Sequence, residues 1–159
     1  NPTDYTGRAN IMWAGTVAHN DITGCGTTGD WATHCIEHEL SGMFDVSHGA
    51  GLAAVWGSWA RYTRQENLPR FVRFAHNVMG VDTADMDCIE ASEAGIRALE
   101  AFFLKIGMPT NIHSLIGRDV TDGEIETMAD KCTNGDTITV GGLMQLRKAD
   151  VMEIYRMAR

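Results

Sequence analysis

Apolar residues recur at intervals of three and four along most of this chain, the spacing that gives a helix one apolar face. The longest such run covers residues 85–106 and is stopped by Gly107 and Pro109. Only residues 136–140 look like a strand, and one short strand without a partner forms no sheet. We therefore predict an all-α, multi-helical domain. Its helices are expected at residues 9–18, 31–40, 48–64, 68–78, 85–106, 121–132 and 148–158.

Two of the expected helices carry further predictions. Small and apolar residues fill positions 9–18, and this composition favours a buried helix. Ser47 is expected to cap the helix that follows it. Trp13, Trp56 and Trp59 are expected to lie in the core rather than against a cofactor.

The size and charge of the chain exclude several classes of partner. Its 159 residues suffice for one domain with its own hydrophobic core. The 21 acidic residues outnumber the 13 basic ones, giving a net charge of −8 that disfavours nucleic acid and anionic membrane surfaces. No window reaches the roughly 18 apolar residues of a transmembrane helix. We predict neither a nucleic-acid partner nor a membrane partner.

The cysteine pattern suggests a compartment. Cys25, Cys35, Cys88 and Cys132 are widely spaced and form no C-x-x-C pair, a pattern typical of reduced thiols, with a disulfide framework as the alternative. The chain starts with Asn1 instead of Met, as a processed or excised product would, so the absence of a signal-peptide pattern says little about the native start. A cytoplasmic protein is expected.

Three of the six histidines fall within fifteen residues, at His34, His38 and His48. On a helix His34 and His38 lie about 40° apart and one turn from each other, so both imidazoles can reach one point. Glu37 lies on the same side, and a turn containing Gly42 lets His48 face the same space. Neutral imidazoles suit Zn²⁺ or Fe²⁺, so the block predicts a metal site. The isolated histidines at 19, 76 and 113 are expected to take no part in it.

A zinc hydrolase is the competing interpretation of this block. Residues 34–38 match the H-x-x-E-H pattern, in which both histidines bind zinc and the intervening Glu37 activates water. That site also needs an acidic ligand downstream. The candidates are Glu90, Glu93 and Glu100. A helical interaction module without catalytic activity is a third hypothesis.

A glycine pattern nearby resembles a dinucleotide-binding fingerprint. Residues 24–29 spell G-x-G-x-x-G, but that motif works only after a buried strand in a βαβ unit. The preceding segment here is predicted to be a helix. We therefore interpret residues 24–29 as a loop beside the histidines.

Three segments around the histidines, at residues 29–34, 38–41 and 45–53, resemble the iron-containing (group III) alcohol dehydrogenases, in particular their NADPH-dependent butanol dehydrogenase branch. Weaker similarity extends through residues 10–14, 106–110 and 150–155. This family is similar in fold to dehydroquinate synthase. The resemblance implies that residues 1–159 are the C-terminal helical, metal-contributing domain. It also implies that the N-terminal nucleotide-binding domain is absent from this chain.

The resemblance also implies roles for the histidines. His34 and His48, fourteen residues apart, match two metal ligands of the family, and His38 matches a histidine that moves protons. The family's D-x-x-x-H helix, which supplies the other two ligands, is not found upstream. Asp30 and His34 have that spacing but overlap the second element. Cys25 and residues 138–142 are expected at the rim of the pocket, and no residue here is assigned to the nicotinamide.

For the complete protein the resemblance implies a dehydrogenase of small alcohols and a reductase of aldehydes. Hydride would come from NADP(H) or NAD(H), bound mainly by the other domain. The divalent metal, Fe²⁺ foremost with Zn²⁺ as the alternative, would polarise the substrate oxygen. A homodimer is expected for the full-length protein, and this fragment alone is expected to be inactive.

Overall fold

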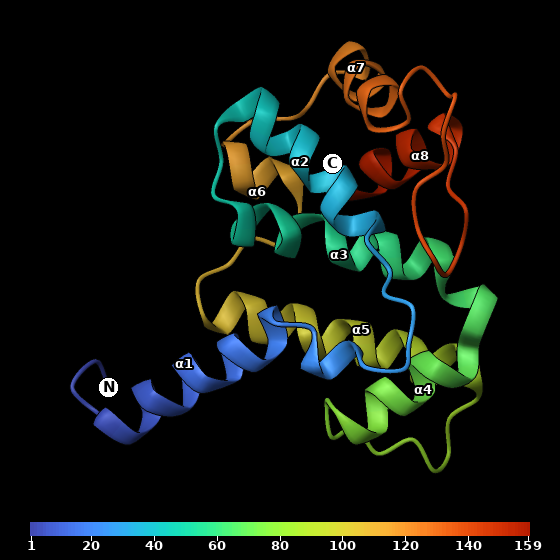
Figure 1. The fold of residues 1–159 in the computed structure, drawn as a ribbon. Coiled ribbons are helices and arrows are strands. Elements are labelled where there is room, and N and C mark those ends of the chain that lie inside the picture. Colours follow the sequence, from blue (N-terminus) through green and yellow to red (C-terminus); the bar gives the residue numbers. More distant parts are fainter.

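The computed structural model describes residues 1–159, and it is helical throughout. Figure 1 shows short helices joined by loops, and the only β-type pairing is an isolated bridge between Val140 and Leu146. The prediction of an all-α domain is confirmed. The helices are α1 (Tyr5–His19), η1 (Ile22–Gly24), α2 (Ala32–Phe44), α3 (His48–Thr63), η2 (Arg64–Asn67), α4 (Leu68–Asn77), α5 (Cys88–Lys105), α6 (Ile112–Ile116), α7 (Asp122–Cys132) and α8 (Lys148–Ala158).

The larger core lies where α2, α3, α6, α7 and α8 meet, in the upper half of Figure 1. Tyr155 of α8 is fully buried there, and its hydroxyl donates a hydrogen bond of 2.6 Å to the carbonyl oxygen of Ile36 on α2. A smaller cluster of Ala60, Phe71 and Ile96 joins α3 to α4 and α5. Because both clusters contain residues of α3, this helix links the two halves of the domain.

Local capping explains where several helices begin. α5 starts at Cys88, later than its apolar periodicity indicates, because Asp87 and Glu90 form a capping box. α3 begins at His48 with Ser47 at the N-cap position, as predicted, but the Ser47 side chain makes no capping hydrogen bond. The 5-residue α6 is too short for a periodic signal, and its cap is Asn111.

Helix α1 forms as predicted but is not buried. Figure 1 shows it extending away from the other helices, and none of its residues is buried. Trp13 is 69% exposed, which corrects its assignment to the core. Trp56 and Trp59 are half-buried and pack against the smaller cluster as predicted. The composition of α1 thus predicted its secondary structure correctly but predicted its burial wrongly.

Other expectations are met more simply. Residues 24–29 form a loop apart from the end of η1, without a preceding strand. All four cysteines are free thiols. No helix has both the length and the apolar character needed to span a bilayer. His19, His76 and His113 are exposed and lie outside the histidine block.

Candidate metal centre

Helices α2 and α3 bring three imidazole rings together. His34 and His38 lie one turn apart on α2, and His48 is the first residue of α3. The chain reverses between the helices at Asp45, whose φ of 53° lies in the left-handed region. The ring centroids of His48 lie 5.3 Å from His34 and 5.4 Å from His38. The predicted convergence of the three rings is therefore present.

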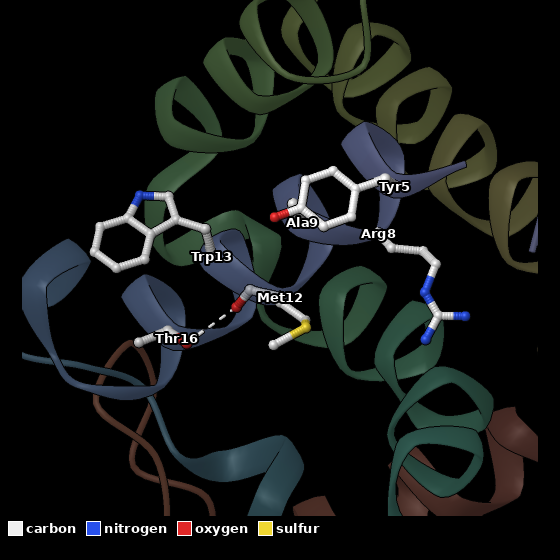
Figure 2. Close-up of a pocket in the computed structure, with 6 residues that line it drawn as sticks. All are labelled: Tyr5, Arg8, Ala9, Met12, Trp13 and Thr16. Carbon is white, nitrogen blue, oxygen red and sulfur yellow. Dashed lines mark hydrogen bonds between the residues drawn. The ribbon is translucent and has the colours of Figure 1, made fainter. Parts of the chain in front are cut away.

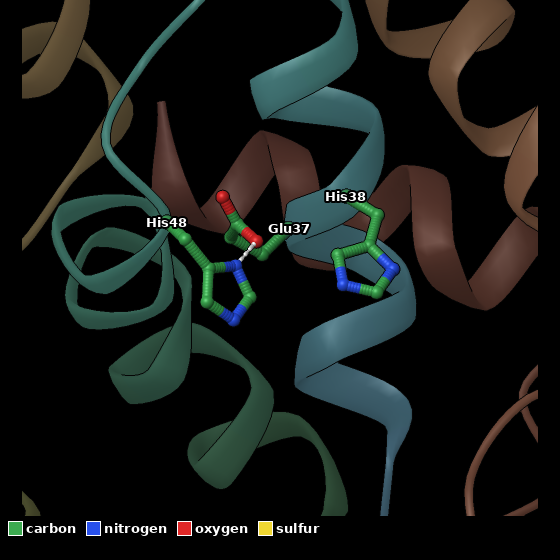
Figure 3. Close-up of side chains that lie close together, drawn as sticks. All are labelled: Glu37, His38 and His48. Atoms are coloured by element: carbon green, nitrogen blue, oxygen red, sulfur yellow. Dashed lines mark hydrogen bonds and ion pairs between the residues drawn. The ribbon is translucent and has the colours of Figure 1, made fainter.

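Glu37 lies beneath this cluster and is fully buried. Its Oε2 and Nδ1 of His48 form a hydrogen bond, drawn in Figure 3, and its Oε1 accepts one from the Ser41 hydroxyl. Potential ligand atoms of Glu37, His38 and His48 lie within 4.8 Å of one another. With Nδ1 of His48 engaged, its Nε2 is the nitrogen left for a ligand.

His34 is the most deeply placed of the three rings. Its Nδ1 is buried and has no hydrogen-bond partner, and the ring edge packs on Trp31 with centroids 4.8 Å apart. Burial lowers the pKa of His34, and the neighbouring His48 and His38 lower it further. A lowered pKa keeps the imidazole neutral, which is the form that binds a metal.

Asp30 accepts hydrogen bonds from backbone groups and does not contribute to the histidine cluster. Its Oδ1 accepts from the backbone N–H of Ala32 at 2.8 Å. Its Oδ2 accepts from the N–H groups of Gly142 and Leu143, at 2.9 and 2.7 Å. Asp30 and His34 have the D-x-x-x-H spacing, but they therefore do not form a pair of metal ligands. Asp30 instead fastens the loop at 142–143 to the start of α2.

The donor set fits a divalent transition metal. Two imidazoles from neighbouring helices face one space, and a buried carboxyl group contacts one of them. Two imidazoles leave the coordination shell incomplete, so further ligands must come from elsewhere in the protein or from solvent.

The amino-acid sequence matches the Fe-containing alcohol dehydrogenase family, C-terminal, over residues 1–159. The chain belongs to this family. It is 37% identical over 154 residues to the probable NADH-dependent butanol dehydrogenase 1 of Bacillus subtilis, covering 96% of this chain and 38% of that protein. It is 35% identical over 111 residues to the NADPH-dependent aldehyde reductase YqhD of Escherichia coli, covering 70% of this chain and 28% of that protein.

Two solved structures of the iron-containing alcohol dehydrogenase family have the same helical arrangement. NADH-dependent butanol dehydrogenase A from Thermotoga maritima superimposes with a TM-score of 0.87 at 32% identity, covering 99% of this chain and 40% of that one. The aldehyde reductase YqhD from Escherichia coli gives a TM-score of 0.91 at 30% identity, covering 100% of this chain and 40% of that one. The predicted fold is confirmed, and the chain spans less than half the length of these proteins.

In this member of the alcohol dehydrogenase family, the acidic ligands that a zinc hydrolase requires are used elsewhere. Glu93 and Glu100 both accept hydrogen bonds from Arg61, with the shortest contact to Glu100 at 2.6 Å. Glu90 belongs to the capping box of α5. Glu37 is buried and bonded on both oxygens, so it is not placed to activate water.

An open cavity of about 830 Å³ lies between the loop at 27–30, α3, α4 and the loop at 142–143, and none of the three clustered histidines lines it. Gly142, from the predicted rim, lines it, whereas Cys25 does not.

The structural roles of Asp30 and Glu37 were not predicted from the sequence. Their partners are 112 and 11 residues away, and no local pattern identifies such contacts.

Proposed function

We propose that this chain is the C-terminal part of a metal-dependent, NAD(P)H-linked alcohol dehydrogenase or aldehyde reductase. His34 and His48 would hold the divalent ion, Fe²⁺ foremost with Zn²⁺ as the alternative, and His38 would carry a proton. The convergence of the three imidazoles carries the proposal, since it places two potential ligands and one acid–base group at one point. Family membership supports the reaction class.

Each residue contributes a separate part of the chemistry. The bound ion would polarise the oxygen of the alcohol or aldehyde, while the nicotinamide exchanges hydride. His34 and His48 orient this ion from two helices. His38 is exposed beside them, so its ring can exchange a proton with solvent and deliver it to the substrate oxygen.

The remaining polypeptide would supply the nucleotide-binding domain and the other metal ligands. The structure supports this at α1, where one face has nothing packed on it. Figure 2 shows the residues that line a pocket on this helix. Its lining residues all belong to α1: Tyr5, Arg8, Ala9, Met12, Trp13 and Thr16. Exposed apolar surface of this kind is costly, so we propose that another part of the same full-length polypeptide covers it.

The proposal for the full-length protein also includes an oligomeric state and a location in the cell. A homodimer is proposed from the family resemblance. A cytoplasmic location is supported by the free thiols, two of which, Cys25 and Cys88, are exposed. The substrate would be a small alcohol or aldehyde.

Metal content and turnover test the proposal. In the full-length polypeptide, His34→Ala and His48→Ala should each remove most of the bound metal, measured by elemental analysis, and abolish aldehyde reduction by NAD(P)H. His76→Ala is the matched control, since His76 is exposed on α4 and should affect neither readout. Unchanged metal content and rate in His34→Ala would contradict the proposal. The 159-residue chain alone should bind metal weakly and show no turnover.

A further inference from the structure

We propose that Glu37 is a positioning residue that holds His48 in its Nδ1–H tautomer. In this arrangement the lone pair of Nε2 points away from Glu37 and is available in the space shared with His34 and His38. This inference deepens the proposed metal site, and its effect on metal affinity rests on the proposed function. The tautomer itself is a property of the metal-free chain.

Burial makes the contact between Glu37 and His48 a strong one. The Glu37 side chain is 0% exposed, so its carboxylate needs partners inside the protein. It has two, the Ser41 hydroxyl on its own helix and Nδ1 of His48 on α3. A low-dielectric site strengthens each of these hydrogen bonds, because water does not compete for the same atoms.

His48 depends on this contact for its orientation. The ring is 49% exposed, so packing constrains it on one side only. The bond from Nδ1 to Glu37 is its one hydrogen bond to the protein. A histidine that binds a metal commonly donates its other N–H to a carboxylate, which fixes both the tautomer and the ring plane. Figure 3 shows this contact as a dashed line between the Glu37 carboxyl group and the His48 ring, with His38 on the right.

The backbone of α3 leaves room for the carboxylate at Gly51. A Cβ atom on residue 51 would lie 2.5 Å from Oε1 and 2.7 Å from Cγ of Glu37. Any side chain there would push the carboxylate away from His48. A Cβ atom on Gly49, in the same turn of α3, would meet nothing within 4 Å beyond its chain neighbours and the backbone of its own helix, so this glycine provides a matched control.

The tautomer is read directly by ¹⁵N NMR of the chain, at a pH where the His48 ring carries a single proton. Wild type and Glu37→Gln should show His48 protonated on Nδ1, because the Gln amide oxygen still accepts this hydrogen bond. Glu37→Met removes the acceptor and should give mixed tautomers. Ser41→Ala leaves the bond to His48 in place and should retain the Nδ1–H form.

Gly51→Ala and Gly49→Ala test the same geometry without altering Glu37. Gly51→Ala should lose the Nδ1–H tautomer, and Gly49→Ala should keep it. This pair also remains informative should Glu37→Met fail to fold. A wild-type His48 protonated on Nε2, or an unchanged tautomer in Gly51→Ala, would overturn the inference.

Titration with Co²⁺ alone measures the consequence for the metal site. Affinity should fall about 10- to 100-fold in Glu37→Met and Gly51→Ala, the usual loss when an outer-shell partner is removed. Glu37→Gln should stay much closer to wild type, and so should Gly49→Ala. Equal affinities in all variants would overturn the positioning role. Absence of Co²⁺ binding in the full-length wild type, with the Nδ1–H tautomer present, would instead contradict the proposed metal function.

Discussion

Tyr155 on α8 donates its buried hydroxyl to the carbonyl oxygen of Ile36 on α2, at 2.6 Å. Ile36 immediately precedes Glu37, so this bond ties the C-terminal helix to the backbone beside the histidine cluster. The two residues are 119 positions apart in the sequence. The contact therefore couples the stability of the whole domain to the geometry of α2.

Tyr155→Phe should destabilise the chain by about 1–1.5 kcal/mol, because one buried hydrogen bond is lost while the ring still fills its site. Urea denaturation monitored by circular dichroism measures the difference. Tyr5→Phe is the control, since Tyr5 is exposed and should give no change. Equal stability of Tyr155→Phe and wild type would contradict this role.

His38→Asn in the full-length enzyme should separate proton transfer from metal binding. We expect normal metal content with kcat reduced about 10²- to 10⁴-fold, the usual contribution of a general acid–base group. Elemental analysis and steady-state kinetics give the two readouts. A variant that loses its metal along with its activity would show that His38 is a ligand instead.

Gly95 allows α4 and α5 to approach closely. A Cβ on residue 95 would lie 2.6 Å from Cβ and 2.8 Å from Cα of Ala75, and the Cα cannot rotate away. Gly95→Ala should therefore cost about 1–3 kcal/mol through overpacking. Gly42 lies in α2, and a Cβ atom there would meet nothing within 4 Å beyond the backbone of its own helix. Gly42→Ala should therefore raise the free energy of unfolding by up to about 1 kcal/mol. Denaturation midpoints of the two variants should move in opposite directions.

Tyr62 joins α3 to α8 by donating a hydrogen bond of 2.6 Å to Oδ1 of Asp150. This bond raises the pKa of Tyr62 to about 12 from its ordinary value of 10.0, with burial as the second cause. The stabilisation should be complete below pH 10 and should disappear as the pH rises to about 12.

Tyr62→Phe isolates this effect from the titration of other tyrosines. At neutral pH the variant should be less stable than wild type by about 1 kcal/mol, allowing for the partial exposure of the pair. The difference should shrink between pH 10 and 12. Chemical denaturation of both proteins at several pH values measures it, and a difference independent of pH would refute the assignment.

Much of the fold followed from the sequence because helical periodicity is local. The seven predicted helices are all present, and their ends differ from prediction where a capping side chain decides them, as at Asp87. Short elements escaped prediction, since α6 spans 5 residues and cannot show a repeating apolar face. The four-residue spacing of His34 and His38 likewise predicts their common helix face without any tertiary contact.

Tertiary structure alone decided how these local elements are used. The sequence placed Glu37 near the histidines, but only the packing of α2 on α3 at Gly51 joins its carboxylate to His48. Apolar composition indicated that α1 is a helix and wrongly placed Trp13 in the core. Secondary structure depends on neighbours within one or two turns, whereas burial and side-chain partners depend on segments that the chain brings together only when it folds.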